Sequence, residues 1–221
     1  MRWTAVLPLF LALSAAPAFG QDILTLPVGK YADFATSTDE KSLMDQDDPV
    51  MRKWVDNNIE NIVKIVSIER ANARAIINFA SAKMTLPIPL GWYAMDDGER
   101  GAAFTADEDV RIIARQLDLE FEGVPSIEQY AAVKRGIQQQ RAPRARIAER
   151  RLPGGQVVNI YEGVPPRAND RGPRTIYEIL TAHPTDKKRG HQILLGVPDG
   201  QGIKYLPLLG LITQDAKIEW K

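Results

Sequence analysis

Eight arginines form the densest group of side chains in this sequence that could bind a charged ligand. They lie in a stretch with few acids and comprise Arg141, Arg144, Arg146, Arg150, Arg151, Arg167, Arg171 and Arg174. A guanidinium group presents a planar fork of N–H donors that matches the oxygens of a carboxylate or a phosphate. Within the stretch, Arg144, Arg146 and Arg150 on one side of a strand could therefore contact an acidic protein or an anionic ligand, such as a phosphate or a lipid headgroup.

A β-hairpin is the element expected to position part of this group. Residues 145–151 and 156–161 have the pattern of two strands, and Pro153 and Gly154 stand between them. A proline followed by a glycine fits the two central positions of a type II turn, in which the glycine takes a positive φ. The sequence therefore predicts a type II turn at this point.

The register of this hairpin decides which side chains share a face. The predicted turn sets Ile147 opposite Ile160 and Arg146 opposite Tyr161, a pairing that matches apolar with apolar side chains. The favoured interpretation of this arginine face is a solvated strand face that discourages edge-to-edge aggregation, and a binding role is the alternative. The candidate binding face consists of Arg144, Arg146, Arg150 and Tyr161.

The residues needed for catalysis are sparse. The chain has two histidines, His183 and His191, and no Gly-x-Ser-x-Gly motif, so a serine hydrolase is disfavoured. Ser126 is better explained as a helix cap. Zinc bound by His183, Asp186 and His191 is conceivable, but this spacing matches no dedicated metal motif, and two exposed histidines are the favoured interpretation. We predict no catalytic residue, no metal ligand and no cofactor.

The acidic residues and a glycine-rich segment suggest two further kinds of site, a carboxylate hydrolase site and an anion site. The acids at 96–97 and 107–109 lie in predicted turns, where solvated loops are the common explanation. A hydrolase would need two carboxylates held across a cleft, which spacing cannot show. The segment 196–202 is rich in glycine and precedes a predicted helix, so it could offer backbone N–H groups to an anion. It has neither a P-loop nor a dinucleotide-binding fingerprint.

Composition and the first residues indicate where the protein acts. Arg2, an apolar run from Ala5 to Leu13 and small residues ending at Gly20 are typical of a secretory signal peptide cleaved between Gly20 and Gln21. The apolar run is too short to cross about 30 Å of hydrocarbon. We expect a periplasmic or secreted protein with no transmembrane segment after cleavage.

The absence of cysteine and the balance of charge narrow the possible partners. With no cysteine, the chain has no disulfide and no thiolate chemistry, so its fold depends on the apolar core. The 28 basic and 28 acidic residues cancel. A neutral chain is a poor candidate for nonspecific binding to nucleic acid.

The chain divides into four predicted segments. Residues 1–20 are the signal peptide and 21–48 an extended lead-in. Residues 49–82 are a helical segment, because Pro49 suits a first helical turn and apolar residues recur at helical spacing up to Ile68. Within it, 71–82 is compatible with helix or strand. Residues 83–221 form an α+β domain, and an exposed stripe on the helix 49–68 would make the protein an adaptor.

The domain opens with strands. The stretch Met84–Ile88 alternates, with Pro87 and Pro89 restricting it to a sheet edge. From Val110 to Phe121 the apolar alternation changes phase, which predicts a strand with a β-bulge near Arg115; a helix is the alternative.

The helices are expected later in the chain. Ser126 caps a helix with Gln129 three residues on, and Pro143 bounds it. A second helix is expected at 207–213, because Pro207 fits a first turn. A strand at 216–220 closes the domain.

This order of elements resembles that of the PsbP-like and DcrB-like family. The motifs that carry the resemblance are Pro89-Leu-Gly-Trp92, the alternating stretch 110–121, Ser126-Ile-Glu-Gln-Tyr130 and Ile218-Glu-Trp220. The resemblance covers 83–221 and implies an antiparallel sheet flanked by helices, with accessory or binding roles and no active site to transfer. The sequence thus predicts a noncatalytic exported binding protein; a carboxylate-using hydrolase and the adaptor are the alternatives.

Overall fold

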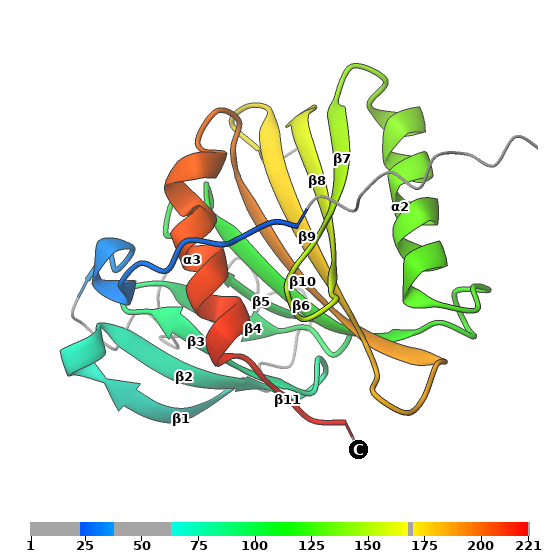
Figure 1. Ribbon diagram of the computed structural model, residues 1–221. Helices are drawn as coiled ribbons and strands as arrows, with labels where there is room; N and C mark the ends of the chain where they lie inside the picture. The colour runs from blue at the N-terminus through cyan, green and yellow to red at the C-terminus, as the bar shows by residue number, and fades with distance from the viewer. Residues whose placement is uncertain (1–22, 38–62, 168–169, 221) are drawn as a thin grey trace, which may run out of the picture.

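The computed structural model describes residues 23–37, 63–167 and 170–220, which form two antiparallel sheets, two α-helices and short 3-10 turns (Figure 1). The predicted class, an α+β fold with antiparallel sheet and flanking helices, is therefore confirmed. The structure has two sheets, however, where the sequence suggested one.

The larger sheet has seven strands in the order β4-β5-β6-β10-β9-β8-β7. Its strands are β4 (Tyr93–Asp96), β5 (Gly101–Phe104), β6 (Arg111–Asp118), β7 (Arg146–Arg151), β8 (Val157–Val164), β9 (Arg174–Ala182) and β10 (Arg189–Pro198). The smaller sheet has the order β1-β2-β3-β11. It consists of β1 (Val63–Glu69), β2 (Arg74–Phe79), β3 (Met84–Pro89) and β11 (Lys217–Ile218). The helices are α2 (Ile127–Arg141) and α3 (Gly202–Asp215), with 3-10 turns η1 (Tyr31–Asp33) and η3 (Arg70–Asn72).

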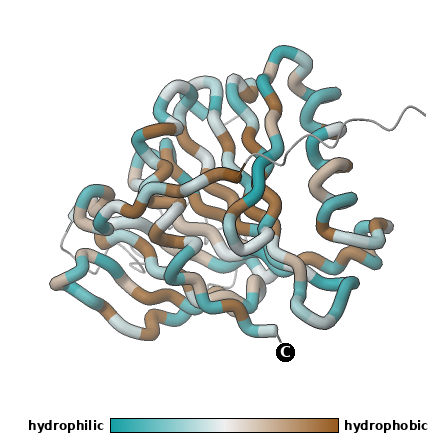
Figure 2. Tube along the Cα trace, viewed as in Figure 1, coloured by the Kyte–Doolittle hydropathy of each residue, from teal (hydrophilic) through white to brown (hydrophobic). Residues whose placement is uncertain are grey.

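The two faces of the larger sheet are covered by different elements. On one face, a large core joins this sheet to the smaller sheet and to α3, whose Leu208 and Ile212 are fully buried. On the other face, α2 packs Ile127, Tyr130 and Ala131 over the β8–β9 end. Figure 2 shows hydrophobic residues along the central strands, whereas α2 is largely hydrophilic. Burial on both faces removes most of the apolar surface from water, and this burial stabilises the fold.

These two faces explain the change of phase in β6. The strand pairs with β10 from Arg111 to Asp118 without a register shift, so the predicted bulge is wrong. Ile112 belongs to the core beneath α3, and Leu117 to the core beneath α2. Because successive side chains point to opposite faces, a regular strand with apolar residues first on one face and then on the other gives the same pattern as a bulge.

The helix predicted at 49–68 is wrong where the structure describes it. Residues 49–62 lie outside the described part of the chain, but 63–69 form the strand β1, which pairs with β2. Of the two options for 71–82, helix or strand, the structure has the strand β2 at 74–79. The β-branched residues of this stretch suit a pleated surface better than a helix. A register shift between Ile65 and Ser67 leaves Val66 over half exposed, and a second shift lies between Tyr161 and Val164 in β8.

Other local predictions have mixed outcomes. Ser126 caps α2 by accepting a hydrogen bond from the amide N–H of Gln129 at 3.3 Å, as expected. The strand β3 is not an edge strand, because it lies between β2 and β11, but β11 pairs only with its first two residues, so Pro87 and Pro89 have a paired strand on one side only. The helix α3 starts earlier than predicted, with Pro207 inside it. A Cβ at Gly202 would collide with the Tyr177 hydroxyl, so glycine permits this earlier start.

The segment 23–37 runs across α3 and is part of the main core (Figure 1). Tyr31 is buried, and Leu26 and Phe34 pack against the same core. The amide of Leu24 donates to the Arg151 carbonyl at 2.7 Å, and the Trp92 indole donates to the Phe34 carbonyl at 2.9 Å. The lead-in is therefore extended, as expected, but packed along this part.

Candidate functional site

The hairpin β7–β8 does not have the predicted register. Ile147 pairs with Tyr161 and Arg146 with Glu162, one residue away from the prediction. The turn is a three-residue loop: the Gly155 amide donates to Leu152 at 2.8 Å, and the Leu152 amide donates to the Gln156 carbonyl at 3.0 Å. The positive φ of 83° falls on Gly155. A type I turn followed by a left-handed glycine accounts for the extra residue.

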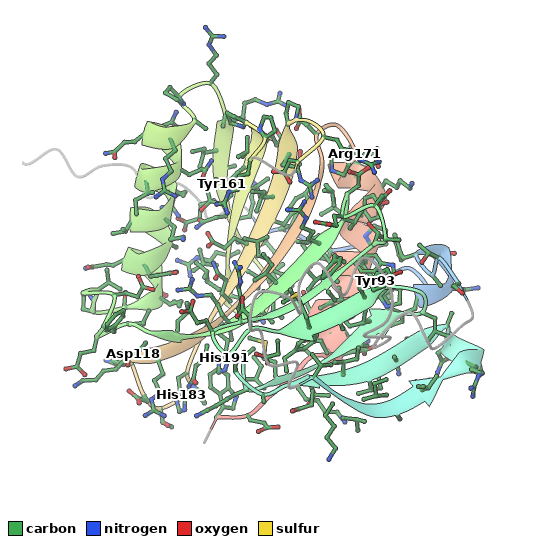
Figure 3. The ribbon with its side chains drawn as sticks, turned by 180° about the vertical axis from the view of Figure 1, so that it is seen from behind. Tyr93, Asp118, Tyr161, Arg171, His183 and His191 are labelled. Carbon is green, nitrogen blue, oxygen red and sulfur yellow. The ribbon has the colours of Figure 1, made fainter. Side chains whose placement is uncertain are left out.

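The candidate binding face is therefore not assembled as predicted. Paired residues share a face, so Tyr161 (Figure 3) lies with Ile147, on the side of α2. Successive strand residues point to opposite faces, so Arg146 and Arg150 lie on the other side. Arg146 is 83% exposed and forms an ion pair with Glu162 at 2.9 Å. Arg150 donates to the Glu149 carbonyl at 2.8 Å, and Arg144 is exposed in the turn before β7. The binding role of these arginines remains a prediction.

Tyr161 belongs to a buried polar cluster under α2. Its hydroxyl donates to the Glu178 carboxylate at 2.7 Å, and Asn159 donates to the same oxygen at 2.8 Å, while Gln192 donates to the other oxygen. Burial, followed by the negative charge of Glu178, raises the pKa of Tyr161 well above its usual range. Arg135 of α2 donates to Asn159 at 2.7 Å. This saturated network holds the helix on the sheet.

A different set of arginines surrounds a cavity of about 200 Å³ on the same side of the sheet as α2. We call it the arginine groove. The last turn of α2, the segment after β8 and the start of β9 line it. Its lining residues are Gln138, Arg141, Ala142, Val164, Pro165, Arg167, Asp170, Arg174 and Ile176.

The groove carries more positive than negative charge. Three of its side chains are guanidinium groups and one is a carboxylate, that of Asp170. That carboxylate is also shared: Arg111 approaches it at 3.0 Å and Arg174 at 4.0 Å. Arg174 is only 6% exposed, and burial, together with the nearby Arg111, lowers its pKa. The lining of the groove thus has more cationic than anionic groups, with one buried guanidinium group, that of Arg174, and two exposed ones, those of Arg141 and Arg167.

A second cavity, of about 140 Å³, lies next to the groove. We call it the apolar pocket, because Met95, Ala102, Phe104 and Ile113 supply its hydrophobic lining. Four of its five charged residues form ion pairs with each other: Arg100 contacts Asp97 at 2.8 Å, and Arg111 contacts Glu108 at 3.8 Å. Arg167 lines both cavities.

The sequence identified the arginines of the groove as members of a basic stretch but not as a site. Arg141 ends a helix, Arg167 lies in a loop and Arg174 begins a strand. No single periodicity connects such positions, so only the tertiary fold brings them together. The one feature of the sequence that indicated a basic site was the low number of acids in the arginine-rich stretch 141–174.

The two histidines do not have the exposed positions expected for them. His191 is 1% exposed, and His183 is half-buried. The two histidines lie near each other (Figure 3). The Trp220 ring contacts both, with its centroid 4.7 Å from that of His191 and 4.8 Å from that of His183. Among the described residues, no three side chains of metal-ligating type gather at one point.

The carboxylates of the acidic turns accept hydrogen bonds from groups close to them. Asp96 is buried and accepts hydrogen bonds from the amides of Ser81 and Gly98, both at 3.0 Å. Asp107 accepts from the Thr105 hydroxyl at 2.5 Å, and this bond lowers its pKa although burial opposes the change. The loop before α3 opens on a cavity lined by Asp107 and Asp109, which disfavours the anion site considered there.

Comparisons with known proteins leave the family open. No family model matches the chain, and no curated protein matches it. Among solved structures, the fold is similar to that of the Ran-binding protein Mog1p of Saccharomyces cerevisiae. The two chains are 12% identical with a TM-score of 0.45, over 72% of this chain and 96% of Mog1p. Within the described residues, no helix is long and apolar enough to cross a membrane.

Proposed function

We propose that this chain is an exported, noncatalytic binding protein that recognises an anionic ligand in the arginine groove. The observation that carries the proposal is the gathering of Arg141, Arg167 and Arg174 around one cavity that contains a single, already shared carboxylate. An anion entering the cavity would relieve the repulsion between the guanidinium groups and replace solvent as their partner.

The electrostatic attraction between an anion and the guanidinium groups is large enough to favour binding. Two opposite charges about 4 Å apart attract by about 4 kcal/mol at the effective dielectric of a protein surface. Arg174 is fixed by the fold, because it donates to the Gly196 carbonyl at 3.3 Å. A positioned donor loses less conformational freedom on binding than a mobile one. The groove therefore offers one preorganised cation and two exposed ones, Arg141 and Arg167.

Two parts of the proposal rest on the sequence alone. Export depends on the signal-peptide pattern in residues 1–20. The relation to the PsbP-like and DcrB-like family depends on the order of motifs between 83 and 221. N-terminal sequencing of the protein from a periplasmic or culture fraction tests the first; a mature chain that begins at Gln21 is expected, and an intact Met1 in the cytoplasmic fraction would contradict it.

Anion binding is tested by titration with inorganic phosphate at low ionic strength, followed by calorimetry or amide chemical shifts. We expect Arg141→Gln combined with Arg167→Gln to weaken phosphate binding at least tenfold, because two of the three cations are lost. The control is Arg144→Gln combined with Arg146→Gln, which removes the same charge from the hairpin. Equal losses in both double variants, or a larger loss in the control, would refute the groove as the site.

A further inference from the structure

We infer that the ligand of the arginine groove is an anion with an apolar substituent, and that this substituent enters the apolar pocket beside the groove. The inference rests on the anion-binding role proposed above and adds the chemical class of the ligand. Its basis is the arrangement of two unlike cavities with a shared wall.

The two cavities adjoin each other at three side chains. Arg167 lines both. The ion pair between Arg111 of the apolar pocket and Asp170 of the groove, at 3.0 Å, joins their walls. A ligand held by Arg167 is therefore at the border between the charged and the hydrophobic surfaces.

No side chain of β10 separates the two cavities at this border. Gly196 of β10 stands in register between Arg111 of β6 and Ile176 of β9, so the strand residue between the two cavities has no side chain. A Cβ at this position would have its nearest neighbours at 3.7 Å, on Arg174, and 3.9 Å, on Leu194. These are ordinary contact distances, so the glycine is not required by crowding.

The apolar pocket suits a small hydrocarbon group rather than a second anion. Met95, Ala102, Phe104 and Ile113 project from the same face of three adjacent strands. Four of the five charged residues at its rim are already paired with each other. A cavity of about 150 Å³ is large enough for benzene, and this pocket, of about 140 Å³, has a comparable volume.

A comparison of phenyl phosphate with inorganic phosphate tests the apolar pocket separately from the anion site. We expect phenyl phosphate to bind at least tenfold more tightly, since each buried methylene-sized group adds about fourfold in affinity. The Met95 methyl resonance should shift with phenyl phosphate and stay unchanged with inorganic phosphate. Filling the pocket with Ala102→Leu should remove this gain while leaving the affinity for inorganic phosphate within twofold; a thermal melt verifies that the variant is folded.

The outcomes distinguish the two proposals. If inorganic phosphate binds but phenyl phosphate binds no better and Met95 does not shift, the inference about the substituent is wrong and the anion site stands. If phenyl phosphate binding does not depend on Arg141 and Arg167, both proposals fail. A gain from the phenyl group that survives Ala102→Leu in folded protein overturns the assignment of the substituent to this pocket.

Discussion

Replacing His191 by phenylalanine should make the protein more resistant to acid. His191 is almost fully buried, and within the described part of the chain neither ring nitrogen has a hydrogen-bond partner. Burial lowers its pKa to about 4, with smaller contributions from the positive charges of His183 and Lys83, while the nearby Ala82 carbonyl opposes the shift. Phenylalanine keeps an aromatic ring against Trp220 and removes two buried, unsatisfied polar atoms.

The size of the effect follows from the difference in pKa between the two states. An unfolded histidine has a pKa near 6.5, so the unfolded chain binds a proton that the folded chain does not bind between pH 6.5 and about 4. Stability due to this group is complete above pH 6.5 and is lost as the pH falls through this window. At about 1.4 kcal/mol per pH unit, the loss is at most about 3 kcal/mol.

Urea unfolding at a series of pH values measures this effect. The wild type should lose stability between pH 6.5 and 4 more steeply than His191→Phe, by about one proton equivalent, and at pH 7 the variant should be at least as stable as the wild type because it lacks the two unsatisfied polar atoms. His183→Phe is the matched control: His183 accepts from the Asp186 amide at 2.9 Å and pairs with the Trp220 carbonyl at 3.1 Å, so this variant should lose stability already at pH 7. Identical pH slopes for wild type and His191→Phe would refute the reasoning.

Three further substitutions test the local structure by denaturant unfolding at pH 7. Ser126→Ala should cost about 1 kcal/mol, because the first turn of α2 loses its cap; no change would contradict the capping role. Gly155→Ala should cost about 1 kcal/mol, since its φ of 83° is strained for alanine, whereas Gly154→Ala should be nearly neutral; the reverse order would support the type II turn. Tyr161→Phe should cost about 1–3 kcal/mol by removing a donor from the buried Glu178, and a smaller loss would show that water replaces the hydroxyl.

Local signals in the sequence predicted local structure well. The Ser126 cap and the proline limit on α2 are confirmed because they depend on backbone chemistry within a few residues. The phase change in β6 was misread, because a strand covered on both faces gives the same pattern as a bulge. The hairpin register was missed by one residue, because either glycine of the loop could take the positive φ.

From the sequence, only the arginine-rich composition around the candidate site could be predicted, not the site itself. The basic stretch includes all the arginines of the groove, yet the face proposed from alternation chose those on β7 instead. Tyr161 was assigned to that face by a register that the turn did not adopt. The acidic partner of the groove, Asp170, is brought to Arg111 by contact between β6 and the segment before β9, and no pattern in the sequence records such a contact.

The packing of the segment 23–37 on α3 means that this segment reaches its native place only after α3 has been made. The Tyr31 hydroxyl donates to Asp215, 184 positions away, at 3.3 Å. Pairings between such distant positions carry a large loop-closure cost and form slowly. A growing chain that still lacks α3 therefore leaves Leu26 and Tyr31 uncovered, and the main core is completed only when residues 202–215 have been synthesised.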